Sequence, residues 1–192
     1  MPALIASLIE LFVLFLLIKG IYNFIRALIL RARFCRHLRA MSQRLGYSLV
    51  KSRTFLASFF RAGTRPDLIL CTDDTKYLIC FVTCQARKRF YHFIDADRYI
   101  RSMKLFITLP MAKKADETRL FAKLKKAPHL DAALLEQDDA KKVVPVLLFN
   151  PAPVEISYLN EQRTKSPIVG NGSQLYHWYA FDATAFFHTI QR

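Results

Sequence analysis

Glycine, cysteine and histidine are scarce in this 192-residue sequence, and they form none of the common phosphate-binding or metal-binding spacings. The five glycines include no GxGxxG or GxxxxGK arrangement, so the dinucleotide-binding turn and the phosphate-binding loop are both missing. Four cysteines and five histidines form no CxxC or HxxxH pair, the spacings most typical of zinc ligands. A GxSxG nucleophile turn is also missing. These motifs therefore predict neither a cofactor nor a resident metal.

Acidic residues are missing from a long stretch near the N-terminus. No Asp or Glu occurs from Leu11 to Pro66, whereas this stretch contains 11 of the 29 basic residues. From Asp67 onward 18 basic residues stand against 14 acidic ones, so most of the net charge of +14 belongs to one segment. A basic segment beside an apolar run is typical of a membrane flank, and it gives little support to a nucleic-acid-binding domain as a whole.

A long apolar run opens the chain. Residues 2–18 contain Glu10 as their only charge, and the apolar character resumes soon after Lys19. About 20 helical residues are needed to cross the hydrocarbon core of a bilayer. The run reaches this length when the helix continues to Ile25, provided that the side chain of Lys19 extends toward the head groups. We predict a transmembrane signal anchor over residues 1–31. A cleaved signal peptide needs positive charge before the run, and none precedes Lys19; a buried core helix and a membrane-embedded hairpin are competing interpretations of the same run.

The charges beside the apolar run predict its orientation. The basic residues of this flank are Lys19, Arg26, Arg31, Arg33, Arg36 and Arg39. Because basic flanks stay in the cytosol, we predict a single pass through the cell membrane, an outside N-terminus and a cytoplasmic domain over residues 32–192. The flank would attract anionic lipid of the inner leaflet. Glu10 is costly in lipid, which suggests either a place near the outer interface or a membrane-protein partner.

The residues after the anchor predict one α/β domain with a mixed sheet. A helix is expected over residues 32–46, with Gly46 at its end and one apolar stripe formed by Phe34, Leu38, Met41 and Leu45. Strands are expected at residues 47–60, 67–71, 77–84, 143–150, 154–160 and 174–181. Further helices are expected at residues 90–106, 111–126 and 129–137, and after an N-cap at Asp182. Strands that are apolar on both faces predict a sheet covered on both sides.

The order of these elements, with RPDLIL at residues 65–70 and KYLICFV at residues 76–82, resembles the restriction-endonuclease-like fold of the PD-(D/E)xK nuclease superfamily. Nuclease-related domains on bacterial membrane proteins look similar. The resemblance implies an αβββαβ core over about residues 35–110. It also implies a magnesium-binding acid at the start of the second strand, another acid in the third strand and a lysine two residues later. Asp67 fits the first of these positions.

The remaining two motif positions do not match this sequence. Counted from the hairpin turn, the acidic position falls on Cys80 and the lysine position on Val82, and neither side chain binds magnesium. A second register places Gln85 and Arg87 there, although glutamine offers one neutral oxygen and arginine does not give up its proton. The resemblance therefore implies a degenerate nuclease-like fold, or alternatively a divergent magnesium-dependent nuclease that uses Asp67, Gln85 and Arg87.

A basic and aromatic run, ARKRFYHF at residues 86–93, could contact nucleic acid through Arg87, Lys88 and Arg89. Such a run is more often a solvated turn followed by aromatic core residues. We therefore predict a membrane-anchored binding or scaffolding module on a degenerate nuclease-like fold. A divergent nuclease and a subunit of a membrane complex on an unrelated α/β fold are the competing hypotheses, and nucleic acid stays an open partner.

Overall fold

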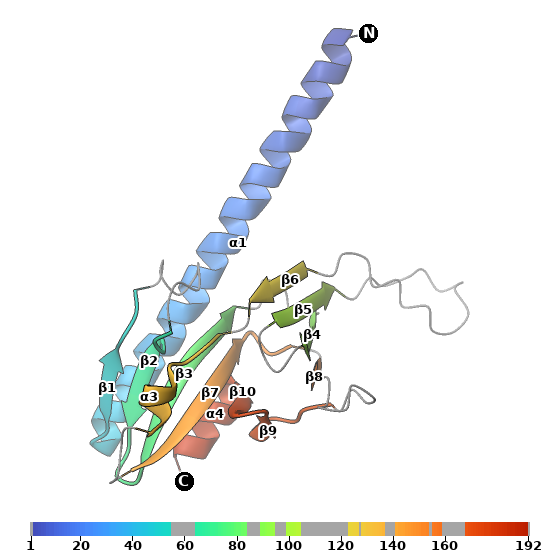
Figure 1. The fold of residues 1–192 in the computed structure, drawn as a ribbon. Coiled ribbons are helices and arrows are strands. Elements are labelled where there is room, and N and C mark those ends of the chain that lie inside the picture. Colours follow the sequence, from blue (N-terminus) through green and yellow to red (C-terminus); the bar gives the residue numbers. More distant parts are fainter. Residues whose placement is uncertain are drawn as a thin grey trace, which may run out of the picture.

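The computed structural model shows an α/β domain from which the first half of a long helix projects (Figure 1). The structure describes residues 2–54, 64–83, 89–94, 99–104, 123–126, 128–136, 141–153, 155–158 and 168–191. Among these residues the helices are α1 (Pro2–Leu45), α3 (Ala132–Glu136) and α4 (Ala183–Ile190). The strands are β1 (Ser48–Lys51), β2 (Leu68–Cys71), β3 (Thr75–Thr83), β4 (Arg89–Ile94), β5 (Tyr99–Lys104), β6 (Lys123–Lys126), β7 (Lys142–Asn150), β8 (Glu155–Tyr158), β9 (Ser173–Leu175) and β10 (Trp178–Asp182).

The larger sheet has six strands in the order β1-β2-β3-β7-β10-β9. Strands β1, β2 and β3 form an antiparallel meander, in which Leu68 of β2 pairs with Ile79 of β3. Strand β7 lies parallel to β3, with Val146 opposite Ile79, and β10 lies parallel to β7. A smaller sheet has the order β6-β5-β4-β8. The predicted mixed α/β domain with one long N-terminal helix is therefore confirmed.

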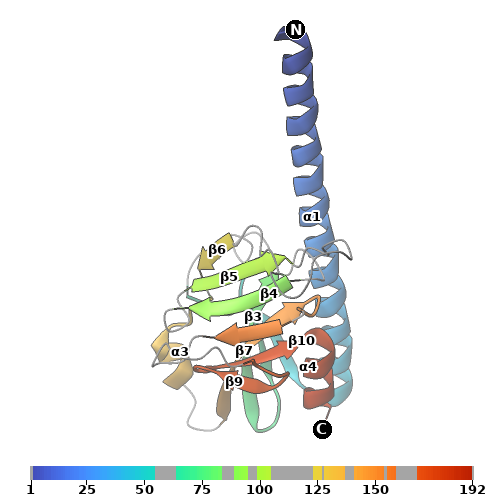
Figure 2. The ribbon, with the colours of Figure 1, turned by 90° about the vertical axis from the view of Figure 1, so that its right-hand side faces the viewer.

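Two apolar cores lie on opposite faces of the larger sheet. On one face, α1 and α4 pack side by side against the strands (Figure 2), and Leu38 and Phe186 are the fully buried helix residues of this core. On the other face, Tyr91 and Phe93 of the smaller sheet pack over Leu147 of β7. Because both faces are covered, the central strands β3 and β7 need apolar residues at nearly every position, which explains the continuous runs in the sequence.

Helix α1 passes from an exposed segment into the domain core. Every side chain from Ile5 to Tyr22 is exposed, whereas Phe34, Leu38 and Met41 are buried against the sheet. By length and composition, its apolar N-terminal part is able to cross a membrane. The helix runs through the predicted boundary at residue 31 without interruption and ends at Leu45, where Gly46 adopts a φ of 74°. That left-handed conformation suits glycine and confirms the predicted helix end.

Several strand and cap predictions are confirmed. Strands β2, β3, β7 and β8 occupy the predicted positions, and α3 falls within the helix expected at residues 129–137. Strand β1 covers only part of the predicted strand, whose residues 55–60 lie outside the described part of the chain. Asp182 caps α4 as predicted, because its Oδ1 accepts hydrogen bonds from the backbone N–H groups of Thr184 and Ala185 at 2.8 and 2.9 Å.

Two predicted helices are wrong where the structure describes them. Residues 90–106 contain the antiparallel strands β4 and β5, and residues 123–126 form β6 instead of the end of a charged helix. In β4 the aromatic residues Tyr91 and Phe93, two positions apart, both point into the core. This two-residue repeat is that of a strand, although the same segment also fits a helical spacing. Most of the predicted charged helix, residues 105–122, lies outside the described residues.

Two smaller predictions are also wrong. Residues 174–181 form the hairpin β9–β10 instead of one strand, with Tyr176 at a φ of 54° in the turn. Leu45 does not join the buried stripe of α1 and keeps 42% of its surface exposed. The buried part of α1 ends at Met41 and Ser42, shortly before the helix stops at Leu45 and the chain continues through Gly46 into β1.

Truncation of Leu38 should destabilise the domain much more than truncation of Leu45 on the same helix. Leu38→Ala is expected to lower the free energy of unfolding by about 2–5 kcal/mol, because it leaves a cavity in the core. Leu45→Ala should change it by less than about 0.5 kcal/mol, because Leu45 is exposed. Denaturation of the full chain in detergent, followed by fluorescence of the single, buried Trp178, measures both values. Equal losses of stability in the two variants would contradict the packing of Leu38 against the sheet.

Candidate functional site

Asp67 is a buried acidic residue at the start of β2, where the meander passes beneath α1. Its Oδ2 accepts a hydrogen bond of 2.7 Å from the backbone N–H of Phe81 in β3. Its own backbone N–H donates to the carbonyl of Ile79 at 2.8 Å, and its carbonyl accepts from the backbone N–H of Ser52 at 3.2 Å. Asp67 therefore joins the start of β2 to both neighbouring strands.

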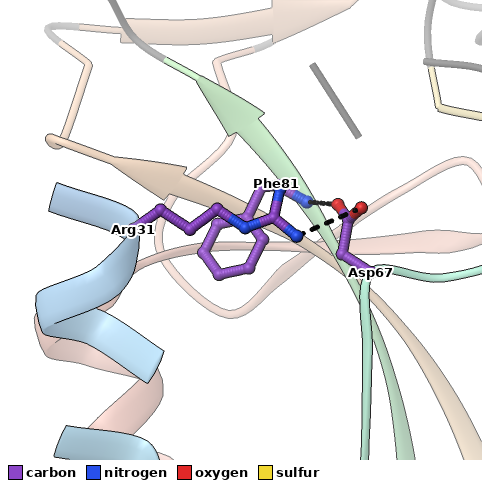
Figure 3. Close-up of polar contacts among 3 residues, drawn as sticks. All are labelled: Arg31, Asp67 and Phe81. Carbon is purple, nitrogen blue, oxygen red and sulfur yellow. Dashed lines mark hydrogen bonds and ion pairs between the residues drawn. The ribbon is translucent and has the colours of Figure 1, made fainter. Parts of the chain in front are cut away.

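Arg31 approaches the same carboxylate from α1 (Figure 3). Its Nη2 lies 3.6 Å from Asp67 Oδ1, and its guanidinium carbon lies 4.6 Å from the centre of the Phe81 ring. Both side chains of the ion pair are at most one-tenth exposed. The Arg31–Asp67 pair is thus a polar clamp between the helix and the sheet, and the ring of Phe81 shields it from solvent.

The structure places one of the three predicted catalytic residues and leaves the other two undescribed. Asp67 lies beside β3, but Cys80 and Val82 on that strand are buried in the core on the far face of the sheet. Gln85 and Arg87 lie outside the described residues. Within the described part of the chain, no group of three His, Cys, Asp or Glu residues is arranged to hold a metal ion.

The predicted nucleic-acid contact is placed only in part. Arg87 and Lys88 lie outside the described residues, whereas Arg89 opens β4 and pairs with Lys104 of β5. The backbone thus brings basic residues of two strands to one end of the smaller sheet.

The predicted membrane flank divides into two groups. Lys19, Arg33, Arg36 and Arg39 are exposed on α1. Arg26 and Arg31 are partly covered by the domain, and Arg31 forms the clamp with Asp67 instead of facing a membrane surface. Sequence reasoning missed this pairing because the two residues are far apart in the chain and only the packing of α1 brings them together.

A pocket of about 220 Å³ lies beside the clamp, between α1 and the first two strands. Its lining residues are Leu28, Arg31, Ala32, Cys35 and Arg39 from α1, Leu49 and Lys51 from β1, and Leu68 from β2. Burial raises the pKa of the Cys35 thiol, although the positive charges of Arg31, Lys51 and Arg39 oppose the rise. The pocket therefore combines an apolar floor, a neutral thiol and three cationic side chains.

Comparisons of the chain with protein-family models, with curated proteins and with solved structures found no match.

Replacement of Asp67 should cost stability, as expected of a structural residue. Asp67→Ala is expected to lower the free energy of unfolding by about 1–3 kcal/mol, because the buried N–H of Phe81 loses its acceptor. Asp67→Asn should lose less, because its amide oxygen still accepts that hydrogen bond. The control Asp73→Ala, at an exposed turn position, should change stability by less than about 0.5 kcal/mol. A neutral or stabilising effect of Asp67→Ala in denaturation experiments would contradict the clamp.

Proposed function

We propose that this chain is a membrane-anchored binding or scaffolding module, whose cytosolic α/β domain sits against the inner face of the cell membrane on a degenerate nuclease-like fold. The observation that carries the proposal is the continuity of α1, which joins an exposed apolar segment to buried core residues without a break. An apolar segment of this length is costly in water and suits a bilayer.

The spacing along α1 supports a domain placed directly at the membrane surface. From Ile5 to Tyr22 the helix rises about 27 Å, close to the roughly 30 Å of a hydrocarbon core. The next residues, Asn23 and Phe24, are the first of α1 after Ile5 that are only partly exposed. Farther along, Asn150 Nδ2 at the end of β7 donates to the Leu30 carbonyl at 3.3 Å. The carboxyl ends of β3 and β7 therefore point toward the proposed bilayer, and β5 and β6 lie on the same side of the domain (Figure 1).

The charges support the proposed orientation. Arg33, Arg36 and Arg39 are exposed on the part of α1 that follows the apolar segment. Basic residues at this place favour a cytosolic domain and an outside N-terminus, and they suit the anionic lipid of the inner leaflet.

The sheet supports the proposed relation to the restriction-endonuclease-like fold. Helix α1 is followed by the meander β1-β2-β3, and β7 then lies parallel to β3, as an αβββαβ core requires. The connection from β3 to β7 contains β4, β5, β6 and α3, and the fourth strand of the smaller sheet, β8, follows β7. The burial of Cys80 and Val82 and the engagement of Asp67 by Phe81 and Arg31 support a binding role over a magnesium-dependent nuclease.

The topology can be tested with tags at the two ends of the full chain in sealed right-side-out membrane vesicles. Added protease is expected to remove the N-terminal tag and to leave the C-terminal tag intact until detergent opens the vesicles. The positive residues after the apolar segment are the physical reason for this outcome. Loss of the C-terminal tag in sealed vesicles, or recovery of the chain without membranes, would reject the proposal.

The nuclease hypothesis can be tested with the full chain in detergent and labelled double-stranded DNA or RNA. We expect no magnesium-dependent cleavage, because the carboxylate of Asp67 already accepts a hydrogen bond from Phe81 and forms an ion pair with Arg31. Binding measured at several salt concentrations shows whether the domain neutralises several phosphates. Cleavage that needs magnesium and disappears in Asp67→Asn, a variant that keeps the acceptor for Phe81, would establish a nuclease instead.

A further inference from the structure

One face of α1 leads from the exposed apolar segment directly into the pocket. Ile21 and Ile25 are exposed, and Leu28, the next residue on the same helical face, already lines the pocket. The spacings of three and four residues continue through Ala32, Cys35 and Arg39, which also line it. A molecule lying along this face of the helix would therefore pass from a lipid environment into the pocket without leaving the surface of α1.

The pocket changes from apolar to cationic along this path. Leu28 lies about 9 Å beyond Tyr22 along the helix axis, close to the depth of a head-group layer. Arg39 is farther along the helix and also lines the pocket, and its positive charge acts on the Cys35 thiol. The influence of Arg31, Lys51 and Arg39 on Cys35 is consistent with convergence of all three cations there.

The charge of the pocket is not balanced by acidic residues in its lining. Arg31 is paired with Asp67, whereas Arg39 and Lys51 form no ion pair with any described residue. Two cations beside leucine side chains in a space of about 220 Å³ suit a ligand that is both anionic and apolar. The raised pKa keeps the Cys35 thiol neutral, so a thiolate does not compete for these cations.

We infer that this pocket binds one anionic phospholipid drawn partly out of the inner leaflet, with the acyl part along Ile25 and Leu28 and the phosphate between Arg39 and Lys51, about 25 Å beyond Tyr22 along the helix axis. The inference rests on the proposed membrane anchorage and adds a defined lipid site to it. Surface attraction alone would act on every exposed arginine of α1, whereas a pocket makes Arg39 and Lys51 different from their neighbours Arg33 and Arg36.

The test uses the full chain in nanodiscs of phosphatidylcholine, with and without phosphatidylglycerol, at high salt that screens surface attraction. Native mass spectrometry counts the phosphatidylglycerol that stays with the protein. Wild type is expected to retain one molecule, and Arg39→Gln with Lys51→Gln should reduce its retention at least about tenfold, since each basic residue contributes to anionic-lipid affinity. The control Arg33→Gln with Arg36→Gln removes the same charge from positions of α1 that do not line the pocket, and it should change retention less than about twofold.

A second pair of variants tests the shape of the site without changing its charge. Ala32→Phe should fill the pocket and abolish lipid retention, whereas Ala40→Phe, at an exposed position of the same helix outside the pocket, should not. Unfolding followed by Trp178 fluorescence checks that all variants remain folded.

Three outcomes would overturn the lipid site. Equal losses of phosphatidylglycerol retention in the pocket and control variants would show that the lipid is held by surface attraction only. Displacement of phosphatidylglycerol by inorganic phosphate, with equal stabilisation by that ion, would show a free-phosphate site instead. Insertion into nanodiscs without any lipid selectivity would reject the pocket while preserving the anchor, whereas failure to enter the nanodisc would reject the anchor itself.

Discussion

The packing of α1 against the larger sheet is the interaction on which the rest of the structure depends. Phe34, Leu38 and Met41 form one wall of a core whose other wall is the sheet, and α4 completes it. The same seating brings Arg31 to Asp67 and leaves the pocket between α1 and β1. A single amphipathic stretch of helix thus supports the core, the buried ion pair and the candidate binding site together.

Much of the fold could be predicted from local sequence. The apolar segment of α1, the strands β2, β3 and β7 and the cap at Asp182 follow from patterns that neighbouring residues determine. The helix expected at residues 90–106 failed because Phe93 and Ile100 fit a helical spacing and also pair across the β4–β5 ladder. Local spacing cannot distinguish these outcomes, since the pairing of two strands decides between them.

The candidate site could be predicted only in part. The position of Asp67 at the start of a strand follows from its sequence surroundings, and so does the basic character of α1. The partner of Asp67 could not be inferred from the sequence. Arg31 belongs to a run of basic residues typical of a membrane flank, and only the packing of α1 on the sheet brings it to Asp67. Lys51 was missed for the same reason, since β1 reaches the pocket only through its pairing with β2.

The unbroken course of α1 has a consequence for encounters with other molecules. A chain tethered by a flexible linker samples many orientations and loses that freedom when it binds. Here the helix proposed to enter the bilayer is also part of the domain core, so the orientation of the domain relative to that helix is fixed before any partner binds. A partner in the same membrane would diffuse in two dimensions and meet a domain surface of fixed orientation. Its effective concentration at that surface would therefore be higher than for a partner in solution, without any added contact.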